Sequence, residues 1–478
     1  MKNNGIVSGV IWSFLERVIA QVVSFVVSIV LARVLSPEDY GVVAILLIFI
    51  TLADVFVSNG FGTALIQDKD ATQEDFSTIF CCSLSVSLLI YAALFFAAPI
   101  IASFYKNDTI TILMRVLAIR IPISAYNTIQ RAYISRNMLF QKFFYVTLIG
   151  TTISAGIGIG LAYNGAGAWA LIAQYLSNTI IDSITLSFIV EWKPKLALNK
   201  QRAKKLMLYG GRVLAAELIG TFFDQLQSLT IGKVYTATEL AYYNKGNQIP
   251  SMISANISNS VMTVLFPAIA NECSDNNKVK GMTRKSVRMM AYIVFPIMFG
   301  LALIAKPMIL LLLSDKWEPS IQYMSILAIS VAFTLVGNTG LQTIKAVGRS
   351  DLLLRIELYK KPVFLALLFL GLHYSVHCVA IVSCLYSIYA MIINFGTMGK
   401  IINYSAREQI KDIMDVGKLS ILMILVLLPL NAFCFKNNAI ELFFKIGVGA
   451  ASYCIASVVF HSQEYFYILG FVRQKMGH

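Results

Sequence analysis

Long apolar runs recur along the whole chain, and they restrict its fold more than any other feature. Runs of at least about 18 residues, folded as helices, can each cross the hydrocarbon core of a bilayer. The composition agrees, because 57% of the residues are hydrophobic and only 13% are charged, whereas about a quarter are charged in soluble domains. Lipid cannot satisfy backbone polar groups, so the runs must be helices. The sequence therefore predicts an all-α, polytopic membrane protein.

We expect about fourteen transmembrane helices, joined by short gaps. The expected segments are residues 8–33, 40–64, 77–101, 110–131, 143–163, 167–190, 206–233, 241–271, 287–312, 320–344, 354–371, 376–400, 415–435 and 438–460.

The basic residues in the gaps alternate between two sets along the chain. One set of gaps holds about 24 Lys and Arg residues and the other about 5, a bias typical of cytoplasmic against outer loops. The few outer ones are Arg33, Lys106, Lys233, Lys316 and Lys436. Both termini are therefore predicted to be cytoplasmic, in agreement with an even number of helices. Topology also explains most of the net charge of +14, so no nucleic-acid partner is expected.

The chain repeats part of itself at a constant offset of about 200 residues, which indicates that one structural unit was built twice. Ser28, Arg33, Val34, Ser58, Asn59, Thr63 and Leu65 align in this register with Ser228, Lys233, Val234, Ser258, Asn259, Thr263 and Leu265.

Several expected helices carry a polar stripe on one face. In the first helix, Ser13, Arg17, Gln21, Ser24 and Ser28 recur every three or four residues, which keeps them on one side. Similar stripes lie on the helices at 110–131, 206–233, 241–271 and 320–344. A charge at the middle of a bilayer costs about 3 to 10 kcal/mol. The stripes therefore predict two helical lobes that face each other across a hydrophilic cavity.

The cationic and amide side chains of these stripes are candidates for binding a substrate in the cavity. They are Arg17, Gln21, Asn59, Arg120, Lys245 and Asn259. Other interpretations remain open for them. The arginines could pair with Glu16, Asp54 or Asp182, the asparagines could join helices through hydrogen bonds, and Lys245 could lie at the membrane interface.

The carboxylates inside expected helices are candidates for carrying a coupling proton or sodium ion. They are Asp54, Asp182, Glu217 and Asp224. No metal site or cofactor is expected, because His373 and His377 lack a third ligand and the phosphate-binding pattern G-x-x-x-x-G-K-[ST] is absent.

Several stretches resemble those of a known transporter family. They include the first helix from Trp12 through Arg17 and Gln21, LARVLSPEDYG at 31–41, NGFGTALIQ at 59–67, GAGAWAL at 165–171 and VLFP at 264–267. Their order and spacing resemble the polysaccharide flippases of the multidrug/oligosaccharidyl-lipid/polysaccharide exporter superfamily. Within it, the chain is most similar to the Wzx-type translocases of lipopolysaccharide and exopolysaccharide, especially the colanic-acid-type branch.

The resemblance implies two pseudo-symmetric six-helix lobes, at 1–195 and 196–405, with two further helices and a cytoplasmic tail at 406–478. It implies alternating access in a bacterial inner membrane, driven by an ion gradient or the membrane potential. The implied cargo is a polyprenyl-diphosphate-linked oligosaccharide for O-antigen, capsule or exopolysaccharide synthesis, and the implied partners are membrane lipid, glycosyltransferases and a polysaccharide polymerase. Arg17 falls where the family has a first-helix arginine. Gln225 and Gln227 replace an Asn-x-Asp pattern of many relatives, which puts an ion role there in doubt.

Two other functions deserve comparison. A drug or cation antiporter of the same superfamily would have a cavity dominated by carboxylates and aromatic residues, and the arginines argue against it. A membrane enzyme such as a polysaccharide polymerase would need catalytic residues on a sizeable loop or an intramembrane His/Asp pair. The expected outer loops are short, so we expect a transporter and not an enzyme.

Overall fold

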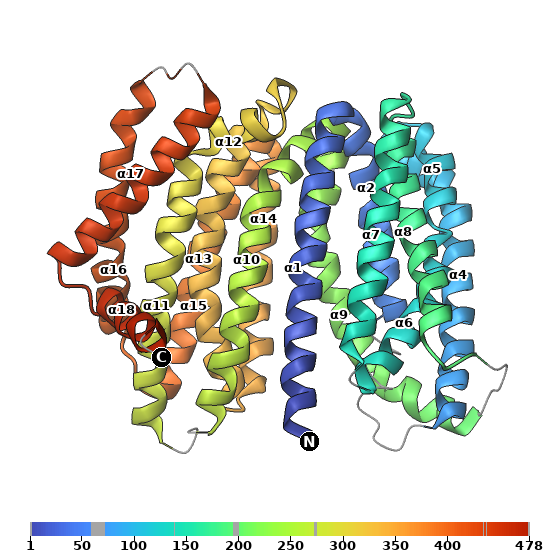
Figure 1. Ribbon diagram of the computed structural model, residues 1–478, viewed down its shortest axis with the longest axis horizontal. Helices are drawn as coiled ribbons and strands as arrows, with labels where there is room; N and C mark the ends of the chain where they lie inside the picture. The colour runs from blue at the N-terminus through green and yellow to red at the C-terminus, as the bar shows by residue number, and fades with distance from the viewer. Residues whose placement is uncertain are drawn as a thin grey trace. The chain divides into compact units, whose positions relative to one another are not determined.

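The structure is a computed structural model that describes residues 2–58, 72–137, 139–194, 200–271, 275–433, 435 and 437–476. Every regular element in these ranges is a helix (Figure 1), so the all-α class is confirmed. The chain divides into two compact units, Met1–Ala241 and Tyr242–His478, and each is described by itself.

The first unit is built around α2, whose apolar residues are buried along most of its length. It packs against α4, α6, α8 and α9, while α7 packs between α1 and α8. The elements of this unit are α1 (Lys2–Val34), α2 (Pro37–Ser58), α4 (Gln73–Tyr105), α5 (Thr109–Leu117), α6 (Arg120–Arg136), α7 (Phe140–Tyr163), α8 (Ala168–Ile189), α9 (Lys200–Val234) and the start of α10 (Ala237–Asn271).

The second unit is centred on α13, which packs against α11 and α15. Gly337 allows a close approach here, because a Cβ at this position would lie 2.9 Å from Met391 Cα on α15. The remaining elements are α11 (Asn276–Leu303), α12 (Ala305–Leu312), η1 (Asp315–Trp317), α13 (Ser320–Ala346), α14 (Ser350–Tyr374), α15 (Val376–Ile402), α16 (Ala406–Leu427), η2 (Leu428–Ala432), α17 (Asn438–Val459) and α18 (Gln463–Met476).

The helix bounds follow the sequence repeat. The helices α1 and α9 end at Val34 and Val234, and α2 and α10 begin at Pro37 and Ala237. The turn is stabilised similarly in both copies. The Asp39 amide donates to Ser36 Oγ and the Glu239 amide donates to Thr236 Oγ1, each at 3.1 Å. A hydroxyl followed three residues later by a carboxylate is the sequence signature of a helix start.

The expected transmembrane segments fall largely on helix where the structure describes them, with breaks at residues 118–119 and 304 and short mismatches at some segment ends. Among the described residues, ten helices are long and apolar enough to cross a membrane; the full number of about fourteen remains a prediction. Several helices begin earlier than expected. Thr72, Asp275 and Ser405 cap α4, α11 and α16 with their side chains, so these helices extend beyond their apolar runs into charged turns. The helix α18 was not expected at all, because its sequence has no long apolar run.

Candidate functional site

Arg120 forms an ion pair with Asp54 inside the first unit. The break between α5 and α6 at residues 118–119 places Arg120 at the first position of α6. Its Nη2 atom donates to Asp54 Oδ2 on α2 at 3.3 Å, and both side chains are largely buried. The sequence analysis left open whether Arg120 binds substrate or pairs with a carboxylate, and this geometry favours pairing.

Asp182 on α8 forms a second, tighter pair with Arg131 on α6. Arg131 Nη2 donates to Asp182 Oδ2 at 2.7 Å. The Asp182 side chain is buried against α7 at Gly150, where a Cβ would lie 2.1 Å from Oδ1. The glycine therefore provides the space that the carboxylate occupies. Arg131 was not among the expected site residues, because its partner lies 51 residues away in the sequence.

Two further side-chain hydrogen bonds connect helices of the first unit. Thr147 Oγ1 donates to Glu16 at 3.0 Å, which joins α7 to α1. Asn127 Nδ2 donates to the Thr179 carbonyl at 3.0 Å, which joins α6 to α8. These contacts use the polar groups as connections between helices, as expected where hydrocarbon surrounds a bundle.

Arg17, in contrast, is exposed on α1. It lies roughly 17 residues, or about 26 Å, before the end of its helix. Among the described residues, it makes no hydrogen bond or ion pair. Gln21, one turn further along the helix, is half-buried. An exposed charge within a candidate span must face water or lipid headgroups, because hydrocarbon would impose a large free-energy cost.

The carboxylates of α9 are exposed, like Arg17. Glu217 occupies the position equivalent to Arg17 in the repeat and is exposed, and Asp224 is exposed two turns further along. Asp54 and Asp182 are less exposed, and each forms an ion pair with an arginine. The four candidate carboxylates thus differ in exposure, with those of α9 the more accessible.

Lys245 is buried near the start of α10 and is 6% exposed. Its Nζ atom donates to Gln248 Oε1 at 3.1 Å and lies 5.6 Å from the centroid of the Trp317 ring. Gly246 allows this close packing, since a Cβ there would lie 2.8 Å from the Met324 amide of α13. Of the two asparagine candidates, Asn59 lies outside the described residues, and only the backbone of Asn259 is described.

The largest network of ion pairs among the described residues lies in the second unit and was not among the expected site residues. Arg284 Nε and Nη2 donate to the two carboxylate oxygens of Asp412 at 2.6 and 2.8 Å. Arg288 Nη1 donates to Asp412 at 2.9 Å, and its Nε donates to Glu464 at 2.6 Å. Asp412 is fully buried and also accepts from the Tyr404 hydroxyl at 2.7 Å. The i, i+4 spacing of the two arginines was the available sequence signal.

The described residues contain no group of three His, Cys, Asp or Glu side chains that could hold a metal ion.

A family model described as "Polysaccharide biosynthesis protein" matches residues 30–322, more than half of the chain. The succinoglycan biosynthesis transport protein ExoT of Rhizobium meliloti is 24% identical over 72% of this chain and 69% of its own length. The lipopolysaccharide biosynthesis protein WzxC of Escherichia coli is 21% identical over 76% of this chain and 75% of its own. A solved structure of the lipid II flippase MurJ, in an inward closed conformation, has a TM-score of 0.76 at 15% identity. The match covers 94% of this chain and 99% of the MurJ chain.

Proposed function

The chain belongs to the polysaccharide biosynthesis protein family and is a membrane transport protein, not an enzyme; on that premise we propose that it flips a lipid-linked oligosaccharide across a bacterial inner membrane. The cargo is a polyprenyl-diphosphate-linked oligosaccharide destined for O-antigen, capsule or exopolysaccharide synthesis. The two copies of the repeat act as lobes that expose a cavity alternately to each side. No bond is made or broken, because the cycle is a population shift between arrangements of the lobes.

The exposed position of Arg17 is the observation that carries this proposal. A sugar diphosphate cannot cross hydrocarbon unaided, and a guanidinium offers it charge-assisted hydrogen bonds. Arg120 and Arg131 are engaged by carboxylates, whereas Arg17 is exposed and makes no ion pair among the described residues. We therefore assign the first contact with the diphosphate to Arg17, with Gln21 beside it on the same face.

The same reasoning ranks the candidates for ion coupling. A carboxylate that binds and releases a proton or sodium ion must be reachable from water during the cycle. Glu217 and Asp224 are exposed, and they lie in the repeat copy of the helix that carries Arg17. They are therefore better candidates than Asp54 and Asp182, whose ion pairs connect helices within one unit.

Replacing Arg17 by alanine tests the proposal. In cells that depend on this protein for export, we expect Arg17→Ala to reduce export at least about tenfold, while the complete lipid-linked intermediate accumulates on the cytoplasmic leaflet. Arg17→Lys should retain part of the activity because it keeps the charge. Arg33→Ala, which removes an exposed arginine from the last turn of α1, is the matched control and should export normally.

Normal export by Arg17→Ala at an unchanged protein level would contradict the role of Arg17. A normal leaflet distribution of the intermediate in cells lacking the whole protein would contradict flipping itself. Extrusion of a cationic drug that depends on Glu217 and Asp224, without any such accumulation, would instead support an antiporter.

A further inference from the structure

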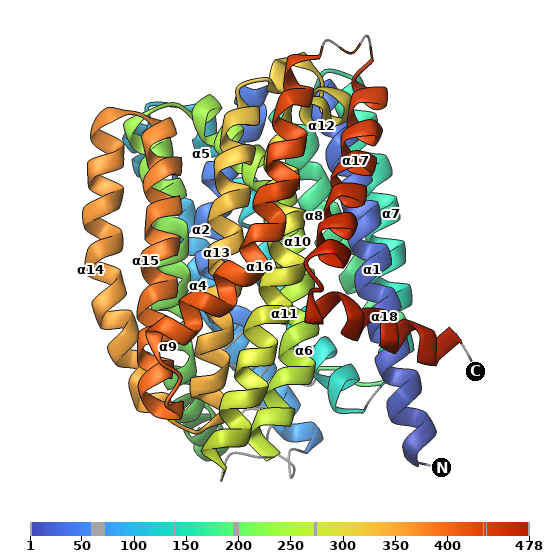
Figure 2. The same ribbon diagram turned by 90° about the vertical axis from the view of Figure 1, so that its left-hand side faces the viewer.

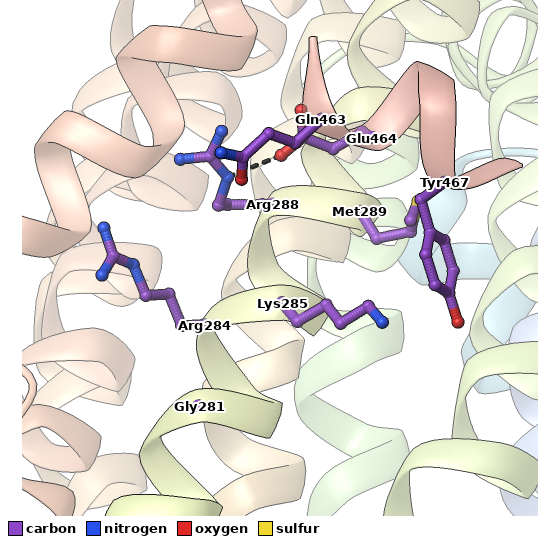
Figure 3. Close-up of a pocket in the computed structure, with 8 residues that line it drawn as sticks. All are labelled: Gly281, Arg284, Lys285, Arg288, Met289, Gln463, Glu464 and Tyr467. Carbon is purple, nitrogen blue, oxygen red and sulfur yellow. Dashed lines mark hydrogen bonds and ion pairs between the residues drawn. The ribbon is translucent and has the colours of Figure 1, made fainter.

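A groove with a volume of about 530 Å³ lies between α11 and α18 of the second unit (Figure 3). Three cationic side chains of α11 line it, Arg284, Lys285 and Arg288, and Glu464 and Tyr467 line it from α18. Gly281, near the start of α11, leaves one end of the groove open, because no atom lies within 4 Å of the position of an added Cβ. The proposed transport cycle makes no use of this groove.

The groove exists because Arg288 holds α18 against α11. Its guanidinium donates to Asp412 on α16 and to Glu464 on α18, and Ser462 Oγ also donates to Glu464 at 2.8 Å. Figure 3 shows Arg288 and Glu464 joined at one side of the groove, with Lys285 extending from α11 towards Tyr467. Arg288 is therefore the structural connection, and its charge is balanced by two carboxylates.

Arg284 and Lys285 remain available to an anion. The Arg284 side chain is 43% exposed although two of its nitrogens bind Asp412, and a guanidinium has five donors in all. The ammonium group of Lys285 lies 3.6 Å from the centroid of the Tyr467 ring, a contact that leaves its three donors unused. The three cations stand against two carboxylates, Asp412 and Glu464, so the cluster keeps one net positive charge, and Lys285 is the cation without a carboxylate partner among the described residues.

The position of α18 indicates where such an anion would come from. The helix begins at Gln463, directly after α17 ends at Val459, and Figure 2 shows that it runs across the direction of α16 and α17. Its exposed aromatic side chains include Phe466 and Tyr467. A short helix with this composition, lying across the end of a membrane helix, is typical of the lipid–water interface. The positive-inside bias assigns this end to the cytoplasmic leaflet.

We propose that this groove binds the phosphate of an anionic membrane lipid of the cytoplasmic leaflet, at the ammonium group of Lys285 and the hydroxyl group of Tyr467 (Figure 3). Phosphate is the ligand class because its oxygens can accept hydrogen bonds from the Lys285 ammonium group and the Tyr467 hydroxyl group together. A lipid is the source because the groove opens beside an interfacial helix. The lipid would stabilise α18 on α11 without entering the transport pathway.

Native mass spectrometry of the full-length protein in neutral detergent tests this site, with dioleoyl-phosphatidylglycerol as the probe. We expect the wild-type protein to retain this lipid in preference to dioleoyl-phosphatidylcholine. Lys285→Ala should weaken its binding about fivefold, the effect of one basic residue on an anionic lipid. Gly281→Glu should weaken it at least as much, because it places a carboxylate in open space at the end of the groove.

Lys400→Ala is the matched control, since it removes an exposed lysine from the last turn of α15, and it should bind the lipid normally. Arg17→Ala should also bind it normally, which separates this site from the proposed function. Equal lipid binding by the wild type, Lys285→Ala and Gly281→Glu would overturn the proposal. Inorganic phosphate that displaces the lipid at comparable concentration would overturn it too, because the groove would then be a site for soluble anions.

Discussion

The buried position of the Asp182 carboxylate requires a residue without a side chain at position 150 of the neighbouring helix α7. A Cβ at Gly150 would lie 2.1 Å from its Oδ1 atom and 3.3 Å from Asn178 Nδ2. The carboxylate would have to move, and its 2.7 Å contact with Arg131 would be lost or distorted. At the scale of one residue, then, a glycine that looks like a packing residue in the sequence determines whether an ion pair can form.

We predict that Gly150→Ala lowers the free energy of unfolding by about 1 to 3 kcal/mol, the usual cost of overpacking. Gly156→Ala on the same helix is the control, because nothing lies within 4 Å of its added Cβ. This control should be neutral or slightly stabilising, since alanine favours a helix over glycine. Thermal unfolding of the purified variants in detergent measures both. Equal melting temperatures for the two variants would contradict the prediction, because the Asp182 side chain would then move aside without lowering the free energy of unfolding.

At the scale of the element, α18 is held mainly through Glu464. Burial opposes ionisation of this carboxylate, but hydrogen bonds from Arg288 and Ser462 outweigh it, so the pKa of Glu464 lies below its ordinary value of 4.5. A carboxylate whose pKa is depressed in the folded state adds stability above its unfolded pKa. That stability is lost as the pH falls through the folded pKa.

We therefore predict that α18 is docked at neutral pH and released as the pH falls below 4.5. Limited proteolysis or hydrogen exchange of residues 463–476 measures the release. Glu464→Gln should raise exchange in α18 already at neutral pH and remove its acid dependence. Asp415→Asn is the control, because Asp415 pairs only locally with Lys418 on α16. Acid release that persists in Glu464→Gln would assign the effect to another group.

At the scale of the whole molecule, the arrangement of basic loops predicts the orientation of the chain in the membrane. Loops on one side carry most of the Lys and Arg residues, and those expected outside carry few. The helix bounds keep this alternation, since α4 ends and α5 begins around Lys106, and α12 and α13 flank Lys316.

We predict that alkaline phosphatase fused after Lys106 or Lys316 is active outside the cytoplasm, and that a fluorescent protein fused to the C-terminus fluoresces in the cytoplasm. A phosphatase fusion after Lys193, in a predicted cytoplasmic loop, is the control and should be inactive. Active phosphatase at the C-terminus would mean an odd number of membrane crossings.

The sequence by itself determined the all-α membrane class and the repeat. Hydrocarbon leaves a polytopic chain of this composition no alternative to helices, and the Ser36 and Thr236 capping signals are local, so helix starts follow from nearby residues. Arg17 also stood out from its stripe alone.

Only the tertiary structure decided which polar residues pair. The stripe that contains Arg120 does not say whether its guanidinium meets Asp54, because that depends on how α6 rotates against α2. Arg131 and Asp182 meet through the gap at Gly150, and Arg288 joins α11 to α18 across 176 residues of sequence. Such contacts are set by the packing of distant helices, which local periodicity does not encode.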